Sequence, residues 1–308
     1  MPSWTRAFDW KAPMYEEGGT GKFMTSRLMT FWMPLTWLLL VTLCAFTAGW
    51  LPIAAPDVMD WEHQSASPGT VISLPQSTGG AESGSRSHIY WFGTDTMGRD
   101  ILSRIITGAR VSLAVGVTAP LIGLTLGGLL GMVAGYFRGW VETIIVGGMD
   151  VILAFPGLVL LLTVGFYFGT DLRTLIPSLG FLTVPAFCRV SRATTLKLAD
   201  REFVIAAKMI GDNNAAILAR EILPNVAIPL CVYGLIIMAL MIVVEGVLSF
   251  LGLSVPPPTP SWGGMIAEGR EVLGEAPHVG LIPAAVLFLT VLSLNILGDT
   301  LRGWSRSL

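Results

Sequence analysis

The sequence predicts an all-α membrane protein with six transmembrane helices and both termini in the cytoplasm. Hydrophobic residues make up 53 % of the 308 positions, and charged residues only 13 %. Typical soluble domains carry roughly 25 % charged residues, and the mean hydropathy here is +0.68. So little polar surface excludes a soluble enzyme, a nucleic-acid-binding protein and a secreted disulfide scaffold.

Six stretches without Asp, Glu, Lys or Arg are the predicted membrane spans. A bilayer-spanning helix needs about 20 mostly apolar residues, and five of the six stretches reach that length. The shortest is bounded by Arg173 and Arg189, whose side chains can reach the membrane interfaces. The stretches are 28–56, 111–137, 151–170, 174–188, 222–244 and 276–298.

The distribution of basic residues gives the orientation, because Lys and Arg accumulate in cytoplasmic loops. With the N-terminus inside, 13 of the 19 basic residues fall in inner segments. We expect a cytoplasmic segment 1–30, a first transmembrane helix 31–52, an extracytoplasmic loop 53–106 with an interfacial helix, and a five-helix core 107–304. The first helix is interpreted as an anchor, because its apolar core exceeds the 7–15 residues of a signal peptide.

The external loop contains a run rich in Ser, Gly and Pro from Gln64 to His88. Such a composition buries too little apolar surface to fold alone. The run is therefore either a flexible external segment or a docking surface for an external partner. The three cysteines lie in apolar stretches without metal-binding spacing, and we expect buried free thiols; they are Cys44, Cys188 and Cys231.

Glycines recur every four residues in the second span, at Gly123, Gly127, Gly131 and Gly135. On a helix they line one face and let another helix approach closely. The pattern indicates either helix packing or a moving interface beside a transport path.

Prolines and one carboxylate interrupt the other apolar spans. Pro156 interrupts the third helix, and Pro177 and Pro185 punctuate the fourth. Proline removes a backbone donor, which a membrane helix tolerates where neighbours or a cavity satisfy the freed carbonyl. Glu245, in the apolar fifth segment, is either a functional group or a structural hydrogen-bonding or interfacial residue.

Catalytic motifs are absent from the sequence. It has no His-Glu-x-x-His, no Gly-x-Ser-x-Gly and no Cys/His cluster. Residues 18–23 superficially resemble a phosphate-binding loop, but Glu16 stands where its first glycine belongs, and Phe23 where Ser or Thr would bind magnesium. We expect neither an enzyme nor a nucleotide or metal site on this chain.

The inner connection 201–229 predicts two short helices. The first, about 200–210, ends at Gly211, and the second, about 213–222, ends before Pro224. An apolar face with i, i+3, i+4, i+7 spacing follows from Phe203, Ala206, Ala207 and Ile210. This face either lies on the bundle or is offered to a cytosolic partner.

Several motifs in order resemble one family. Ala206-Ala207, Gly211 and Leu223-Pro224 resemble the EAA loop of importer-type ABC permeases. Further matches to the subgroup that imports peptides and nickel are Gly93-Thr94-Asp95, Gly98-Arg99-Asp100, Gly108-Ala109-Arg110, Gly135-Tyr136-Phe137, Ala154-Phe155-Pro156, Leu248-Ser249-Phe250-Leu251-Gly252, Pro257-Pro258-Thr259-Pro260-Ser261-Trp262-Gly263 and Asn295-Ile296-Leu297-Gly298-Asp299. The resemblance covers roughly residues 90–304 and is greatest to the C-type permease of dipeptide, oligopeptide and nickel importers.

The resemblance implies a permease subunit of an ATP-driven importer in the bacterial inner membrane. The chain would form half of a peptide pathway that works by alternating access. The implied partners are a homologous B-type permease, two ATPase subunits or one two-domain ATPase, an extracytoplasmic substrate-binding protein and membrane lipid, but no nucleic acid. No cofactor is implied on this chain, because ATP and magnesium would bind the ATPase subunits.

The resemblance also assigns residues to roles. The ATPase-coupling loop, about 200–224, would use Glu202, Phe203, Ala206, Ala207, Gly211, Asp212, Leu223 and Pro224. Helix packing or the pathway would use the four glycines with Pro156 and Glu245, and the binding protein would face Asp95, Arg99, Asp100, Pro258 and Trp262. Ile205 stands where the family usually has Glu, and Glu202 lies one helical turn earlier as a partial substitute.

Two other classes stay open from the residues. A secondary transporter or channel would need an ionisable group for ion coupling, for which Glu245 is the clear candidate. An intramembrane enzyme would need a nucleophile or metal constellation, and we find neither. The substrate also stays open between dipeptides, longer peptides, glutathione and nickel complexes.

Overall fold

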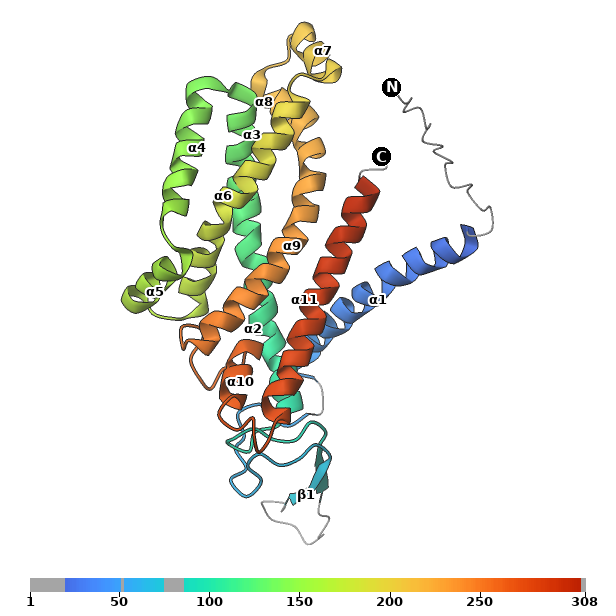
Figure 1. Cartoon of the computed structure of the whole chain (residues 1–308), viewed down its shortest axis with the longest axis vertical. Helices are drawn as coiled ribbons and strands as arrows, with labels where there is room; N and C mark the ends of the chain where they lie inside the picture. Colours follow the sequence, from blue (N-terminus) through green and yellow to red (C-terminus); the bar gives the residue numbers. More distant parts are fainter. Residues whose placement is uncertain (1–19, 51–52, 75–85, 306–308) are drawn as a thin grey trace, which may run out of the picture.

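The computed structural model describes residues 20–50, 53–74 and 86–305 as an elongated bundle of helices (Figure 1). The long helices are α1 (Thr20–Thr47), α2 (Ile101–Ile122), α3 (Gly128–Phe137), α4 (Gly139–Ala154), α5 (Gly157–Phe168), α6 (Leu172–Leu198), α9 (Leu223–Phe250) and α11 (His278–Ser305). The short helices are α7 (Glu202–Ile210), α8 (Asn214–Ile217) and α10 (Trp262–Gly269), with π-helical turns η1 (Gly123–Gly127) and η2 (Leu218–Ile222). The segment 1–19 and residues 75–85 of the Ser/Gly-rich run lie outside the described residues.

The chain is mostly helical, which corrects the all-α prediction in one place. Strands β1 (Thr70–Leu74) and β2 (Arg86–Tyr90) form an antiparallel hairpin in the external loop, with Thr70 opposite Tyr90. In the described part of the predicted loop 53–106, the helical residues are the first ones of α2, which continues into the span, and a separate interfacial helix stays a prediction. Asp100 begins that helix by accepting hydrogen bonds from the backbone of Leu102 and Ser103.

Four continuous helical segments among the described residues are long and apolar enough to cross a membrane. They are Ile101–Phe137, Leu172–Leu198, Asn214–Phe250 and His278–Gly303. The helices α4 and α5 together make a fifth candidate, bent by 76°. The structure therefore has four to five such spans, and the described apolar part of α1, Phe31–Thr47, is shorter.

The break between α4 and α5 lies at Pro156, as predicted. Phe155 is extended (φ −84°, ψ 131°), because proline disfavours the helical conformation of the residue before it. The predicted start of this span at 151 is wrong, since α4 begins at Gly139. Pro177 and Pro185, by contrast, lie inside an unbroken α6.

The glycine stripe packs against α6. A Cβ added at Gly127 would lie 2.3 Å from the carbonyl oxygen of Val184, and one at Gly131 would lie 2.3 Å from that of Cys188. Gly135 likewise approaches the carbonyl oxygen of Arg192, whereas Gly123 lies against the side chains of Thr183 and Phe187. These approaches fit the helix-packing interpretation, and motion at this interface stays a prediction.

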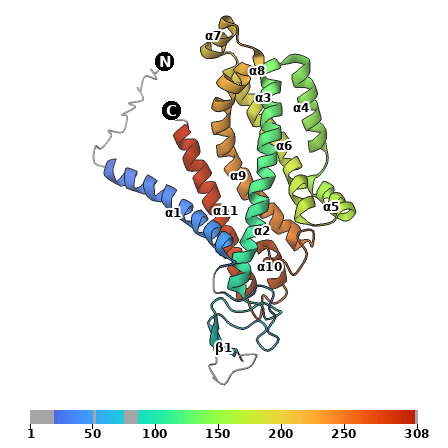
Figure 2. The same ribbon diagram turned by 180° about the vertical axis from the view of Figure 1, so that it is seen from behind.

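The two ends of the bundle differ. One end carries α7, α8 and the C-terminal end of α11, and the opposite end carries the β hairpin and α10, as Figures 1 and 2 show from two sides. Following the predicted orientation, we name these the inner end and the outer end.

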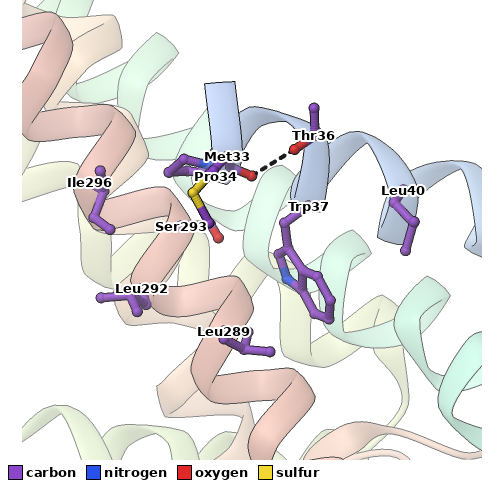
Figure 3. Close-up of a pocket in the computed structure, with 9 residues that line it drawn as sticks. All are labelled: Met33, Pro34, Thr36, Trp37, Leu40, Leu289, Leu292, Ser293 and Ile296. Atoms are coloured by element: carbon purple, nitrogen blue, oxygen red, sulfur yellow. Dashed lines mark hydrogen bonds between the residues drawn. The ribbon is translucent and has the colours of Figure 1, made fainter. Parts of the chain in front are cut away.

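Helix α1 diverges from α11 toward the inner end (Figure 1). Between them lies an apolar groove of about 580 Å³, drawn in Figure 3. Trp37 of α1 lines it and donates a 3.1 Å hydrogen bond from Nε1 to Thr290 Oγ1 on α11. Leu289, Leu292 and Ile296 line the side of α11.

Candidate functional site

At the inner end, α7 stops in a helix-terminating motif that needs glycine. Gly211 has φ +95°, a conformation that costs glycine little and other residues more. Its N–H donates to Lys208 O (3.2 Å), and the Asp212 N–H donates to Ala207 O (3.1 Å). This pair of bonds is the Schellman motif, and it confirms the predicted helix end at Gly211.

The two faces of α7 have different surroundings. Val204 and Ala207 are buried, with 0 % and 7 % exposure, and belong to the main hydrophobic core. Met209 and Ile210 are each 83 % exposed. The same outward surface includes Phe203, Ile205 and Ala206. The predicted apolar face is therefore only partly exposed. Ala207 packs on the bundle, whereas Phe203, Ala206 and Ile210 are exposed.

The second predicted helix of this loop does not end before Pro224. Asn213 begins it by accepting a 2.7 Å hydrogen bond from the Ala216 N–H. The helix then continues through η2 into α9. The early end is wrong because the chain stays helical past Pro224, which directly follows the π-helical turn η2, a local change of hydrogen bonding at which helices accommodate such interruptions.

The remaining predicted coupling residues lie on the surface of the inner end: Glu202, Asp212, Leu223 and Pro224. Polar contacts join this loop to the end of α3. Lys208 Nζ lies 5.0 Å from the centre of the Tyr136 ring, and the Tyr136 hydroxyl donates to Asn214 Oδ1 at 2.9 Å. Sequence reasoning missed the contribution of Tyr136, although its Gly135-Tyr136-Phe137 motif was a signal.

At the outer end, four charged side chains form a buried cluster. Arg99 Nε lies 2.6 Å from Asp95 Oδ2, and Arg99 Nη2 lies 2.8 Å from Glu268 Oε2. Arg104 contacts the same two carboxylates, each at 3.3 Å. The cluster ties the external loop and α2 to α10. Neither arginine side chain is more than 2 % exposed.

The predicted binding-protein-facing residues are mostly buried, which corrects that expectation. Asp95, Arg99, Asp100 and Trp262 are all less than 5 % exposed, while Pro258 is exposed. Asp95 turns inward because its Oδ1 also accepts the backbone N–H groups of Met97 and Arg99. These side chains build the outer loops rather than their surface.

Glu245 is fully buried near the outer end of α9. The hydroxyls of Ser249 and Ser254 donate to its Oε1 at 2.8 and 3.0 Å, and Ser112 donates to its Oε2 at 3.2 Å. These contacts join α2, α9 and the loop after α9. They fit the structural hydrogen-bonding interpretation.

Tyr90 joins β2 to the first part of the external loop. Burial and, after it, the nearby Asp60 carboxylate raise the pKa of its phenol to about 12. The protonated hydroxyl donates a 3.3 Å hydrogen bond to Asp60 Oδ2. It is therefore a fixed donor at physiological pH.

The cysteines are free, and the expectation that all are buried is wrong. Cys188 is buried and Cys44 is partly buried, but Cys231 is exposed on α9. An apolar span has a surface of its own, so a cysteine within it need not face the core. In the part of the chain that the structure describes, no three His, Cys, Asp or Glu side chains gather at a metal-binding distance.

Comparisons with known proteins agree on one family. Residues 123–307 match the family described as binding-protein-dependent transport system inner membrane component. The glutathione transport system permease protein GsiD of Pectobacterium atrosepticum is 40 % identical over 216 residues, covering 70 % of this chain and 72 % of the relative. Its counterpart in Escherichia coli O6:K15:H31 is 41 % identical over 213 residues, covering 69 % and 70 %.

The fold has a counterpart among solved structures. A chain of the inward facing MetNI methionine ABC transporter superposes with a TM-score of 0.54 at 16 % identity. The match covers 65 % of this chain and 95 % of that chain. At this identity the likeness concerns the fold alone.

Proposed function

The chain belongs to the family of binding-protein-dependent transport system inner membrane components, and from this premise we propose that it forms half of a small-peptide pathway and couples it to an ATPase through α7. The family makes it a multi-pass inner-membrane permease subunit of an ABC importer. ATP hydrolysis lies on partner ATPase subunits, and a binding protein supplies the substrate.

The proposed topology has six spans, with α1 as the first and the bent pair α4 and α5 as the third. Helix α1 has 28 residues, which is enough to cross about 30 Å of hydrocarbon. Both termini would lie inside. The position of α7 and the end of α11 at the same end of the bundle supports this arrangement (Figure 1).

The exposed apolar face of α7 is the observation that carries the coupling proposal. Fully burying a Met or Ile side chain contributes about 1.5–3 kcal/mol. Scaled by the 83 % exposure of each, Met209 and Ile210 together offer an ATPase subunit about 2.5–5 kcal/mol. The opposite face is anchored in the core through Val204 and Ala207. A helix held on one side and docked on the other can pass a rigid-body motion into the bundle.

The relatives support a peptide substrate. Two of them are permeases of glutathione transport systems, and glutathione is a tripeptide. A homologous B-type permease would complete the pathway, and two ATPase subunits or one two-domain ATPase would dock at the inner end. The pathway would open alternately to the two sides. This chain would hold no cofactor, with ATP and magnesium bound by the ATPase.

The test is ATP-dependent uptake of a labelled tripeptide by the complete importer in proteoliposomes. The variant Met209→Glu places a charge in the proposed docking face, because Met209 is 83 % exposed. We expect at least tenfold less ATPase co-purifying with the permeases, and a matching loss of uptake. Met97→Glu changes an exposed methionine outside this face and should leave both unchanged.

Two outcomes would contradict different parts of the proposal. Full ATPase retention and uptake in Met209→Glu would refute docking at α7. A wild-type importer that hydrolyses ATP but accumulates no tripeptide would refute the peptide substrate.

A further inference from the structure

A small cavity lies at the outer end, next to the cluster of charged side chains. Its volume is about 250 Å³. It opens between the α5–α6 connection, the end of α9, the loop 251–261, α10 and the first turn of α2. The hydroxyl-bearing and charged side chains that line it are Thr170, Ser249, Ser254, Thr259, Ser261, Arg104 and Glu268.

Arg104 is buried at this cavity with unused donors. Its Nη2 donates to both oxygens of Glu268 at 3.3 Å. Among the described residues, its Nε and Nη1 have no hydrogen-bond acceptor, although Nε lies 3.3 Å from Asp95 Oδ2. A buried donor without an acceptor costs about 1–3 kcal/mol, and more when it is charged. The site therefore lacks an oxygen acceptor.

The ion pair between Glu268 and Arg104 is long. Its 3.3 Å contacts are longer than the 2.7–2.9 Å typical of hydrogen bonds between charged groups. Glu268 is also held by Arg99 at 2.8 Å, and its side chain is 26 % exposed. An arriving carboxylate can therefore share Arg104 without displacing Glu268 from Arg99.

We propose that this cavity is a subsite for the terminal carboxylate of the transported peptide, with the Arg104 guanidinium as its donor. The inference rests on the proposed peptide transport, and it names the place at which this chain contacts the substrate. A volume of about 250 Å³ equals roughly eight water molecules. It lies below the roughly 300–1,000 Å³ of pockets that enclose drug-sized ligands, so it fits one terminal residue rather than a whole peptide.

The place of the cavity suits this role. It lies at the end opposite α7, where a binding protein would release its cargo. The lining hydroxyls both donate and accept hydrogen bonds, so they suit the amide groups of many peptides. The arginine, by contrast, selects for the carboxylate that all unmodified linear peptides share.

The first experiment measures binding of a tripeptide to the detergent-purified importer without its binding protein, by isothermal titration calorimetry. The free acid should bind at least tenfold more tightly than the same tripeptide with a C-terminal amide. Equal affinities would overturn the proposal. This comparison uses the wild-type complex and does not depend on how a variant folds.

The second experiment fills the cavity. Ala267→Leu adds volume at a lining residue of α10 without removing a charge. We expect at least a tenfold weaker affinity for the free acid and a raised KM for its uptake. Ala55→Leu, the same change at an exposed outer alanine, should alter neither. Unchanged affinity in Ala267→Leu, with normal wild-type uptake, would refute the subsite alone. Absence of wild-type uptake would refute the proposed function.

Discussion

The substitution Gly211→Val tests whether the end of α7 must be fixed for transport. Gly211 has φ +95°, and no heavy atom lies within 4 Å of a Cβ added there. The change therefore acts on the backbone alone and creates no steric clash. A residue forced into such a conformation costs about 1–3 kcal/mol, and a β-branched residue falls at the upper end of that range because its χ1 is also restricted.

The expected functional loss follows from this energy. One to three kcal/mol corresponds to about a 5- to 150-fold change in an equilibrium. That change disfavours the conformation in which the Gly211 and Asp212 N–H groups close the helix. The last turn of α7, which carries Met209 and Ile210, would then lose its fixed position. We expect binding-protein-stimulated ATPase activity and tripeptide uptake in proteoliposomes to fall at least fivefold.

Two control variants separate coupling from general strain. Gly139→Val places the same residue at another positive φ (+59°), also with no heavy atom within 4 Å, in the α3–α4 turn. It should keep most of the uptake. Gly211→Asn should also transport, because asparagine tolerates positive φ. Equal losses in Gly139→Val and Gly211→Val, or undiminished uptake in Gly211→Val, would refute the reasoning.

Two further predictions concern stability and are read as melting temperatures of the purified complex. Gly131→Ala should lower the melting temperature by the equivalent of about 1–3 kcal/mol, because its Cβ would lie 2.3 Å from Cys188 O. Gly147→Ala is the control, because no heavy atom lies within 4 Å of its added Cβ and it brings the same gain in helix propensity. It should not lower the melting temperature. An equal fall in melting temperature for the two variants would contradict the packing argument. Glu245→Ala leaves buried serine hydroxyls without an acceptor and should cost about 1–3 kcal/mol. Glu245→Gln keeps an oxygen acceptor and should recover most of this loss, whereas an equal loss would show that the charge itself is required.

The sequence predicted the apolar centres of the spans better than their ends. Helix α4 was hidden because Glu142 and Asp150 interrupt its apolar pattern. In the structure both carboxylates pair with arginines of α6. Arg192 Nε lies 2.7 Å from Glu142 Oε1, and Arg189 Nη2 lies 2.8 Å from Asp150 Oδ1. A search for uncharged windows ends a helix wherever a charge occurs, even when a neighbouring helix neutralises it.

The outer residues show a different limit. The resemblance placed Asp95 and Arg99 on the surface that faces the binding protein, and charged side chains are usually exposed. Their burial depends on Glu268, which lies 169 residues after Arg99. Local sequence carries no sign of that partner. The end of α7, by contrast, was predictable because Gly211 acts through its own backbone and needs no distant partner.

The packing of α6 relates the proposed sites at the two ends. This helix begins two residues after Thr170, which lines the outer cavity, and ends four residues before α7. Its 27 residues span about 40 Å at 1.5 Å per residue. The glycine stripe sets α3 and η1 directly against its backbone, so few side-chain rotamers can absorb a displacement. A shift of α7 by a docked ATPase would therefore reach the outer cavity through α6 as a whole. On this argument Gly131→Ala should weaken coupling as well as stability, whereas Gly147→Ala should weaken neither.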